Sequence, residues 1–63
     1  MNVAIIGAGL IGRKRAAAVN KRDKLLVICD IDLKTAINLA GEYSCVPTDQ
    51  IKYIVNNVNI NAV

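Results

Sequence analysis

The hydrophobic positions of the chain fall into short apolar runs separated by longer segments with helical spacing. The runs predict strands at residues 2–6 and 25–30, and a short third strand at residues 45–46 that Pro47 ends. Residues 60–63 have the composition of the start of a fourth strand. Runs of this kind, rich in Val and Ile, are typical of parallel strands that are covered on both faces.

Three segments between these runs predict helices. Residues 10–20 follow the first run, and residues 33–43 carry apolar side chains at the spacing i, i+3, i+4 and i+7. The stripe of the second helix consists of Leu33, Ala36, Ile37 and Ala40. The stripe of the third helix consists of Ile51, Ile54, Val55 and Val58, and we expect Thr48 or Asp49 as its N-cap.

The strict alternation of these elements predicts an α/β protein with a partial Rossmann fold, β-α-β-α-β-α-β, in which helices cover both faces of a parallel sheet. Right-handed crossovers place the first three strands in consecutive order, with the first two helices on one face. The third helix then covers the other face. The fourth strand pairs with the first strand, on the side that the second strand leaves open.

Three glycines stand where the first strand passes into the first helix. Gly7, Gly9 and Gly12 have the spacing G-x-G-x-x-G. In a phosphate-binding turn the first permits a sharp turn, the second lets a pyrophosphate approach the backbone, and the third lets the helix pack on the strand. The spacing alone is a weak signal, and the surrounding strand, helix and second strand make it specific. The alternative is a glycine-rich turn that binds nothing, or that binds another nucleotide.

An acidic residue ends the second predicted strand. Asp30 follows Gly12 at about the 20-residue distance of the ribose-binding carboxylate in dinucleotide-binding folds. A carboxylate there accepts hydrogen bonds from the ribose hydroxyls and repels a 2′-phosphate, so NAD is favoured over NADP. Asp32 is the competing candidate, but Leu33 begins a helical pattern directly after it. We therefore expect Asp32 to be the N-cap of the second helix.

The whole chain has a net charge of +3, and its positive charge is concentrated in the first part of the sequence. A cluster at residues 13–15 lies in the first predicted helix. Aromatic residues make up only 3% of the chain, so basic residues interleaved with aromatic ones, as in many nucleic-acid-binding proteins, are lacking. We interpret the cluster as a solvated helix face that also attracts a pyrophosphate, and we expect no nucleic-acid partner.

The chain has only 63 residues, yet 54% of them are hydrophobic. This interior-like composition in so short a chain predicts that residues 1–63 are a piece of a larger protein. Cys29 and Cys45 are expected to be small buried thiols, not a disulfide or a metal site. No run is long enough to span a membrane, so we expect no membrane partner and a cytoplasmic location.

Several motifs together resemble one family. Residues 7–12, followed by Arg13, Arg15 and Ala16, and then residues 27–32, are similar to the N-terminus of the Gfo/Idh/MocA oxidoreductases, the glucose-fructose oxidoreductase and inositol dehydrogenase group. The resemblance covers nearly the whole chain but only the first part of a typical member. It therefore implies that residues 1–63 are the N-terminal part of a dinucleotide-binding domain whose remainder, with the catalytic domain, is absent. Further matching positions are Ala36, Leu39, Ala40, Thr48, Asp49 and residues 60–63.

The chain departs from the family pattern at three places. Arg15 stands where the family often has histidine, Pro47 where an aromatic residue is common, and Asn61 where aspartate is usual. Basic residues at the position of Arg15 also occur in some sugar-nucleotide dehydrogenases of the group. The change at Pro47 puts the short third strand in doubt.

The resemblance implies roles for named residues. Those that line the pyrophosphate turn would be Gly7, Gly9, Leu10, Ile11 and Gly12. Asp30 would hold the adenosine ribose, and Arg13 would contact phosphate. The family's catalytic lysine and its acid or histidine partners find no match, so no catalytic residue is assigned.

The same resemblance implies an NAD(P)-dependent oxidoreductase that transfers a hydride between the nicotinamide and a sugar, polyol or sugar nucleotide. The small sugar-like substrate would bind in the missing domain, and the full protein would be a homo-oligomer. Two alternatives are a nucleotide-sensing regulatory module without catalysis and another class of Rossmann dehydrogenase, such as a homoserine or imine type.

Overall fold

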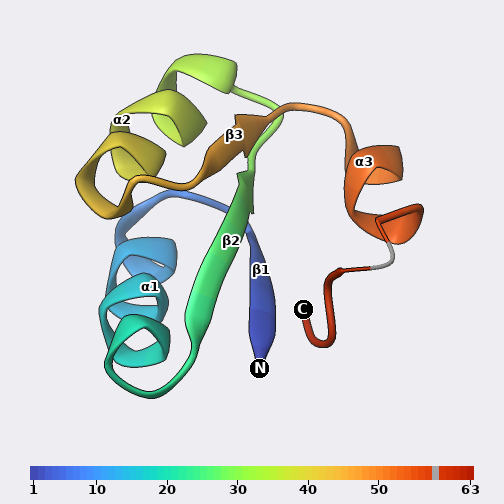
Figure 1. Ribbon diagram of the computed structural model, residues 1–63. Helices are drawn as coiled ribbons and strands as arrows, with labels where there is room; N and C mark the ends of the chain where they lie inside the picture. The colour runs from blue at the N-terminus through green and yellow to red at the C-terminus, as the bar shows by residue number, and fades with distance from the viewer. Residues whose placement is uncertain (58) are drawn as a thin grey trace.

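The computed structural model describes residues 1–57 and 59–63. Strands and helices alternate along the chain (Figure 1). The elements are β1 (Asn2–Ile6), α1 (Leu10–Arg22), β2 (Lys24–Cys29), α2 (Leu33–Tyr43), β3 (Val46–Thr48) and α3 (Ile51–Val55). This order confirms the predicted α/β class and the start of a Rossmann fold.

The three strands form a parallel sheet in the order β1-β2-β3, as the crossover rule predicted. Ile6 is paired with Cys29, so the ends of β1 and β2 lie side by side, with the glycine turn directly beyond β1. The prediction that Pro47 ends the third strand was wrong, because Pro47 lies within β3 and is paired with Ile28. Proline is tolerated there because β3 is an edge strand.

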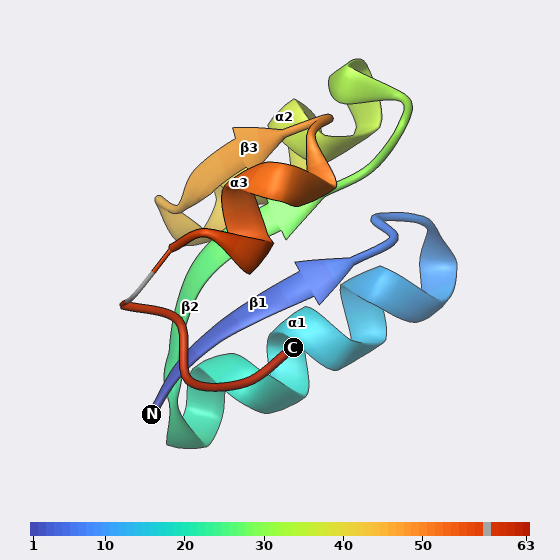
Figure 2. The ribbon, with the colours of Figure 1, turned by 90° about the vertical axis from the view of Figure 1, so that its right-hand side faces the viewer.

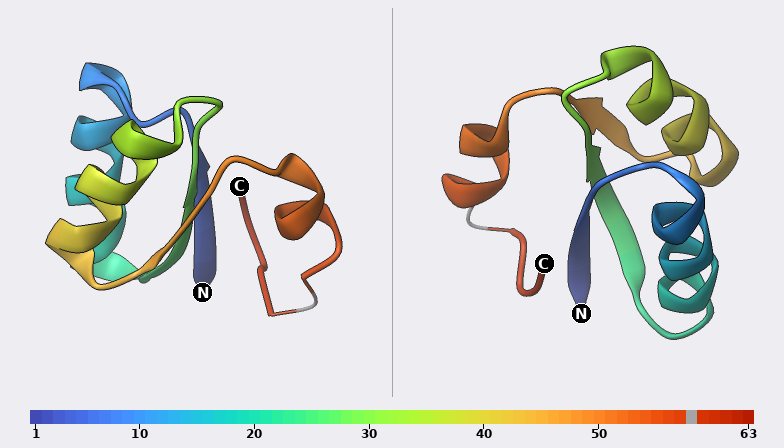
Figure 3. Two further views of the ribbon diagram at one scale, coloured as in Figure 1. Left: turned by 90° about the horizontal axis from the view of Figure 1, so that it is seen from above. Right: turned by 180° about the vertical axis from the view of Figure 1, so that it is seen from behind.

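The helices lie in two layers on opposite faces of the sheet. Figures 1 and 3 show α1 and α2 on one face and α3 on the other, as predicted. Each layer has its own core. The larger cluster, under α1 and α2, contains Ile5, Ala8, Ala16, Leu25, Ile28, Ala36, Leu39 and Ala40. The smaller cluster, under α3, contains Ala4, Val27, Cys29 and Ile54. Successive strand residues thus supply opposite faces.

The buried faces of α2 and α3 differ from the predicted stripes. In α2 the buried residues are Ala36, Leu39 and Ala40, whereas Leu33 and Ile37 are exposed. The sheet therefore meets the small alanines, which allow close approach, with Leu39 beside them.

In α3 only Ile54 is buried, and Ile51 and Val55 are exposed. A helix this short makes little more than one turn, so few of its side chains can face the sheet. Val58, the last member of the predicted stripe, lies outside the described residues.

The helix ends also refine the predictions. The Asp32 carboxylate accepts a hydrogen bond of 3.2 Å from the Lys34 N–H, which confirms it as the N-cap of α2. The N-cap of α3 is Gln50, not Thr48 or Asp49, and the Thr48 hydroxyl instead accepts the Gln50 N–H just before the helix. At the end of α1 the helix continues past the predicted boundary to Arg22, where basic side chains favour a helix C-terminus.

The last described residues return to the open edge of β1. Ala62 forms one parallel bridge with Val3, and the Ala4 N–H donates to the Ala62 carbonyl at 2.9 Å. Figure 2 shows this segment running alongside β1. The predicted pairing with the first strand is present, and the start of the fourth strand consists of this single parallel bridge. The strand order therefore reverses at β1, where ligands bind in open α/β sheets.

Candidate functional site

The turn between β1 and α1 needs glycine at two positions for reasons internal to the protein. Gly7 has φ +98°, a conformation that L side chains rarely adopt, and its N–H donates to the Cys29 carbonyl at 2.7 Å. A Cβ on Gly12 would lie 2.0 Å from the Gly7 carbonyl oxygen, which is a backbone clash. Gly12 therefore permits the close contact of α1 with the end of β1.

Nothing within the protein itself requires glycine at position 9, in contrast to Gly7 and Gly12. The φ of Gly9 is −74°, which any residue can adopt, and a Cβ built on it would meet nothing within 4 Å. The space beside it belongs to an open cavity of about 450 Å³. This cavity is lined by Ile6, Gly7, Gly9, Leu10, Ile11, Gly12 and Arg15. Bare backbone facing an open cavity fits a ligand that must approach the main chain, as a pyrophosphate does.

The start of α1 supplies hydrogen-bond donors to this cavity. Gly9 is the N-cap, and the N–H groups of Leu10, Ile11 and Gly12 have no carbonyl partner in the helix. Among the described residues these groups form no other hydrogen bond. Because the positive end of the helix dipole is also here, the turn is suited to hold an anionic group.

Asp30 lies directly after β2 and is bonded to the turn. One of its carboxylate oxygens, Oδ2, accepts the Ala8 N–H at 2.9 Å, and the other, Oδ1, accepts the Asp32 N–H at 2.9 Å. These two backbone bonds lower the pKa of the Asp30 carboxyl below its ordinary value. The group is therefore a fixed, ionised acceptor beside the glycine turn. Each oxygen keeps further acceptor capacity, which the hydroxyls of a ribose could use.

The structure separates the two arginines that follow the turn. The guanidinium of Arg13 forms an ion pair with Glu42, so it joins the start of α1 to the end of α2. The predicted phosphate contact of Arg13 stays a prediction. Arg15, which was not assigned a role from the sequence, lines the cavity together with the glycines. Arg15 follows Gly12 by three residues, so the two lie on one face of the helix, and this spacing could have identified Arg15 as a residue of the cavity.

The described residues contain no group of His, Cys, Asp and Glu side chains arranged to hold a metal ion. Cys29 is buried and Cys45 is half-buried, and both are free thiols. Burial is the main cause that raises the pKa of each thiol above its ordinary value. Both are therefore thiols of low reactivity. Within residues 1–57 and 59–63, none of the helices combines the length and the apolar character of a membrane-spanning segment.

Comparison with known proteins agrees with this geometry. A family model described as an oxidoreductase family with an NAD-binding Rossmann fold, GFO_IDH_MocA, matches residues 1–63. No curated protein and no solved structure gave a significant match to the chain. The match spans the glycine turn, Asp30 and every element of the sheet. The chain therefore belongs to the GFO_IDH_MocA family of oxidoreductases, with the family's NAD-binding Rossmann fold.

Proposed function

We propose that residues 1–63 bind the adenosine-diphosphate end of NAD in an oxidoreductase that acts on a sugar, polyol or sugar nucleotide. The observation that carries the proposal is the hydrogen bond from the Ala8 N–H to the Asp30 carboxylate. This bond holds the glycine turn and the acid after β2 next to each other, which supports their binding the pyrophosphate and the ribose of a single dinucleotide.

The chain's own residues have separate tasks in this proposal. Gly9 admits the pyrophosphate to the backbone, and the free N–H groups at Leu10, Ile11 and Gly12 bind its oxygens. Asp30 accepts the hydroxyls of the adenosine ribose. When bound, NAD accepts or returns a hydride at its nicotinamide, and the substrate site is assigned to a part of the protein outside residues 1–63.

The charge of Asp30 favours NAD over NADP. An aspartate carboxylate is ionised at neutral pH, and the two backbone hydrogen bonds to Asp30 favour that form further, so it would repel a 2′-phosphate while it accepts a 2′-hydroxyl. In a protein that uses NADP we would expect a neutral or basic residue at this position. Asp30 is therefore the residue on which the cofactor preference rests.

The wider setting follows from the same assignment. We place the protein in the cytoplasm, as a homo-oligomer without a nucleic-acid partner, with residues 1–63 as the N-terminal part of the dinucleotide-binding domain. The basic residues of α1 are explained by helix-end charge and phosphate attraction.

The proposal is tested by measuring hydride transfer in the intact protein. The protein is incubated with NAD and a panel of sugars, polyols and sugar nucleotides, and the formation of NADH is followed by its absorbance. We expect reduction with at least one member of the panel and much slower reduction of NADP. Tight NAD binding without turnover on any panel member would favour a nucleotide-sensing module, and turnover confined to amino-acid or imine substrates would favour another dehydrogenase class.

A further inference from the structure

We propose that Arg15 binds the phosphate on the nicotinamide side of the dinucleotide, an assignment that rests on the proposed binding of NAD at the glycine turn. Arg15 lines the cavity that contains Gly7, Gly9 and Gly12. It also lines a neighbouring groove of about 350 Å³ between β1 and α1. It is thus the charged side chain that the two hollows share.

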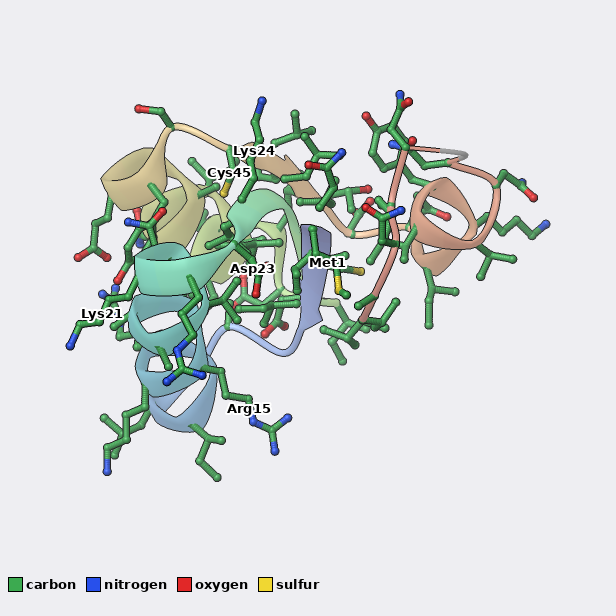
Figure 4. The ribbon with its side chains drawn as sticks, turned by 60° about the horizontal axis from the view of Figure 1, so that its bottom comes forward. Met1, Arg15, Lys21, Asp23, Lys24 and Cys45 are labelled. Atoms are coloured by element: carbon green, nitrogen blue, oxygen red, sulfur yellow. The ribbon has the colours of Figure 1, made fainter. Side chains whose placement is uncertain are left out.

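The position of Arg15 on the helix explains how it reaches the turn. It lies about one and a half turns into α1, and helical side chains lean toward the helix N-terminus. Figure 4 shows its side chain leaving α1 toward the β1 side of the molecule, whereas Lys21 leaves the same helix on the opposite side. The guanidinium therefore extends beside the carboxyl end of β1, where the phosphates would lie.

The neighbouring basic residues are less suited to this task. Arg13 is bound to Glu42, so a carboxylate already neutralises its charge. Lys14 lines neither of the two hollows. Arg15 is exposed and forms no ion pair among the described residues. A guanidinium can bind two phosphate oxygens at once, which makes arginine the better match for this anion.

The direction of the sheet indicates which phosphate Arg15 meets. Asp30 follows β2, which lies on one side of β1. The groove that Arg15 shares lies on the other side, where Val63 lines it and the adjacent Ala62 bridges to β1. A dinucleotide with its adenosine ribose at Asp30 crosses the end of β1 in the direction of Arg15. The second phosphate, which carries the nicotinamide ribose, is therefore the nearer one.

The test compares adenine nucleotides that differ in their second phosphate. Affinities of AMP, ADP and NAD are measured by calorimetry on the intact protein, on Arg15→Gln and on the control Lys14→Gln, which removes the same charge from the same helix. For Arg15→Gln we expect a roughly tenfold loss for ADP and NAD and no change for AMP. We also expect the affinity of Arg15→Gln for NAD to depend less steeply on salt concentration than that of the unmodified protein.

Each other result contradicts a named part of the inference. An equal loss of affinity for AMP and ADP in Arg15→Gln would overturn the assignment to the second phosphate. Equal losses of affinity in Arg15→Gln and Lys14→Gln would contradict a specific contact and indicate only a general attraction of the basic helix for anions. Unchanged affinities in Arg15→Gln would overturn it altogether. If the unmodified, folded protein bound neither ADP nor NAD, the proposed function itself would fail. Arg15→Lys keeps the positive charge, and we expect it to keep part of the affinity for ADP and NAD. The melting temperatures of all variants show whether a loss of affinity is due to a loss of folding.

Discussion

The Asp30 carboxylate accepts the N–H of Ala8 at 2.9 Å across a separation of 22 residues. This bond joins the end of β2 to the middle of the glycine turn, next to the pairing of Ile6 with Cys29. An acid that would bind ribose therefore also fixes the backbone that would bind pyrophosphate. The two halves of the candidate site are coupled before any ligand arrives, which lowers the ordering cost of binding.

Replacing Asp30 by Ala should weaken NAD binding roughly tenfold and relax the discrimination against NADP, because both the ribose acceptor and the bond to Ala8 are lost. Calorimetric titration with NAD and NADP measures both effects. Asp23→Ala is the matched control, since Asp23 pairs with the N-terminal amine of Met1 at the opposite end of the sheet (Figure 4). Unchanged NAD affinity and selectivity in Asp30→Ala would contradict the ribose assignment.

Replacing Gly12 by Ala should destabilise the fold by about 2 kcal/mol or more, because the new Cβ would lie 2.0 Å from the Gly7 carbonyl oxygen and neither backbone can easily move. The free energy of unfolding in urea measures this effect. A Gly12→Ala variant as stable as the unmodified protein would show that α1 can shift away from β1 without cost.

Replacing Gly9 by Ala should leave the stability of the fold nearly unchanged but weaken NAD binding. The Cβ meets no protein atom within 4 Å, so the free energy of unfolding should change by less than about 1 kcal/mol. NAD affinity should fall by at least about tenfold, because the methyl group occupies the space through which the pyrophosphate approaches the backbone. Equal NAD affinity in Gly9→Ala and the unmodified protein would place the ligand elsewhere.

The stability contributed by Asp30 should depend on pH. Its pKa is lower in the folded protein than the ordinary aspartate value, so folding favours the ionised form. This contribution is complete above the ordinary pKa and is lost as the pH falls through the lowered pKa. Urea unfolding across the acid range should therefore show a constant difference between the unmodified protein and Asp30→Asn near neutrality. The difference should shrink on acidification, and one that grew instead would contradict the assigned cause.

The strand order, the helical layers, the glycine turn and the N-cap at Asp32 could be predicted from local patterns. These features depend on apolar runs, crossover handedness and residues such as Gly7 whose conformation is special. The buried side of α2 could not be predicted in the same way. Ile37 and Leu39 are both apolar, and only the packing of α2 against the sheet selects Leu39. Helical spacing predicts a stripe but not which of two adjacent stripes faces the sheet.

The roles of the arginines show the same limit in the candidate site. Arg13 directly follows the last glycine of the turn, and the family resemblance implied that it contacts phosphate. Its ion pair with Glu42 depends on where α2 ends, which no local pattern specifies. The place of Arg15 in the cavity likewise depends on how α1 lies against β1. Contacts between distant elements thus decide which charge is available to a ligand.

The most direct measurement is a crystal structure of the intact protein with NAD bound. The account predicts the adenosine ribose hydroxyls within hydrogen-bond distance of the Asp30 carboxylate and the pyrophosphate against the backbone from Gly9 to Gly12. A dinucleotide bound away from the glycine turn, or with its ribose turned away from Asp30, would contradict it.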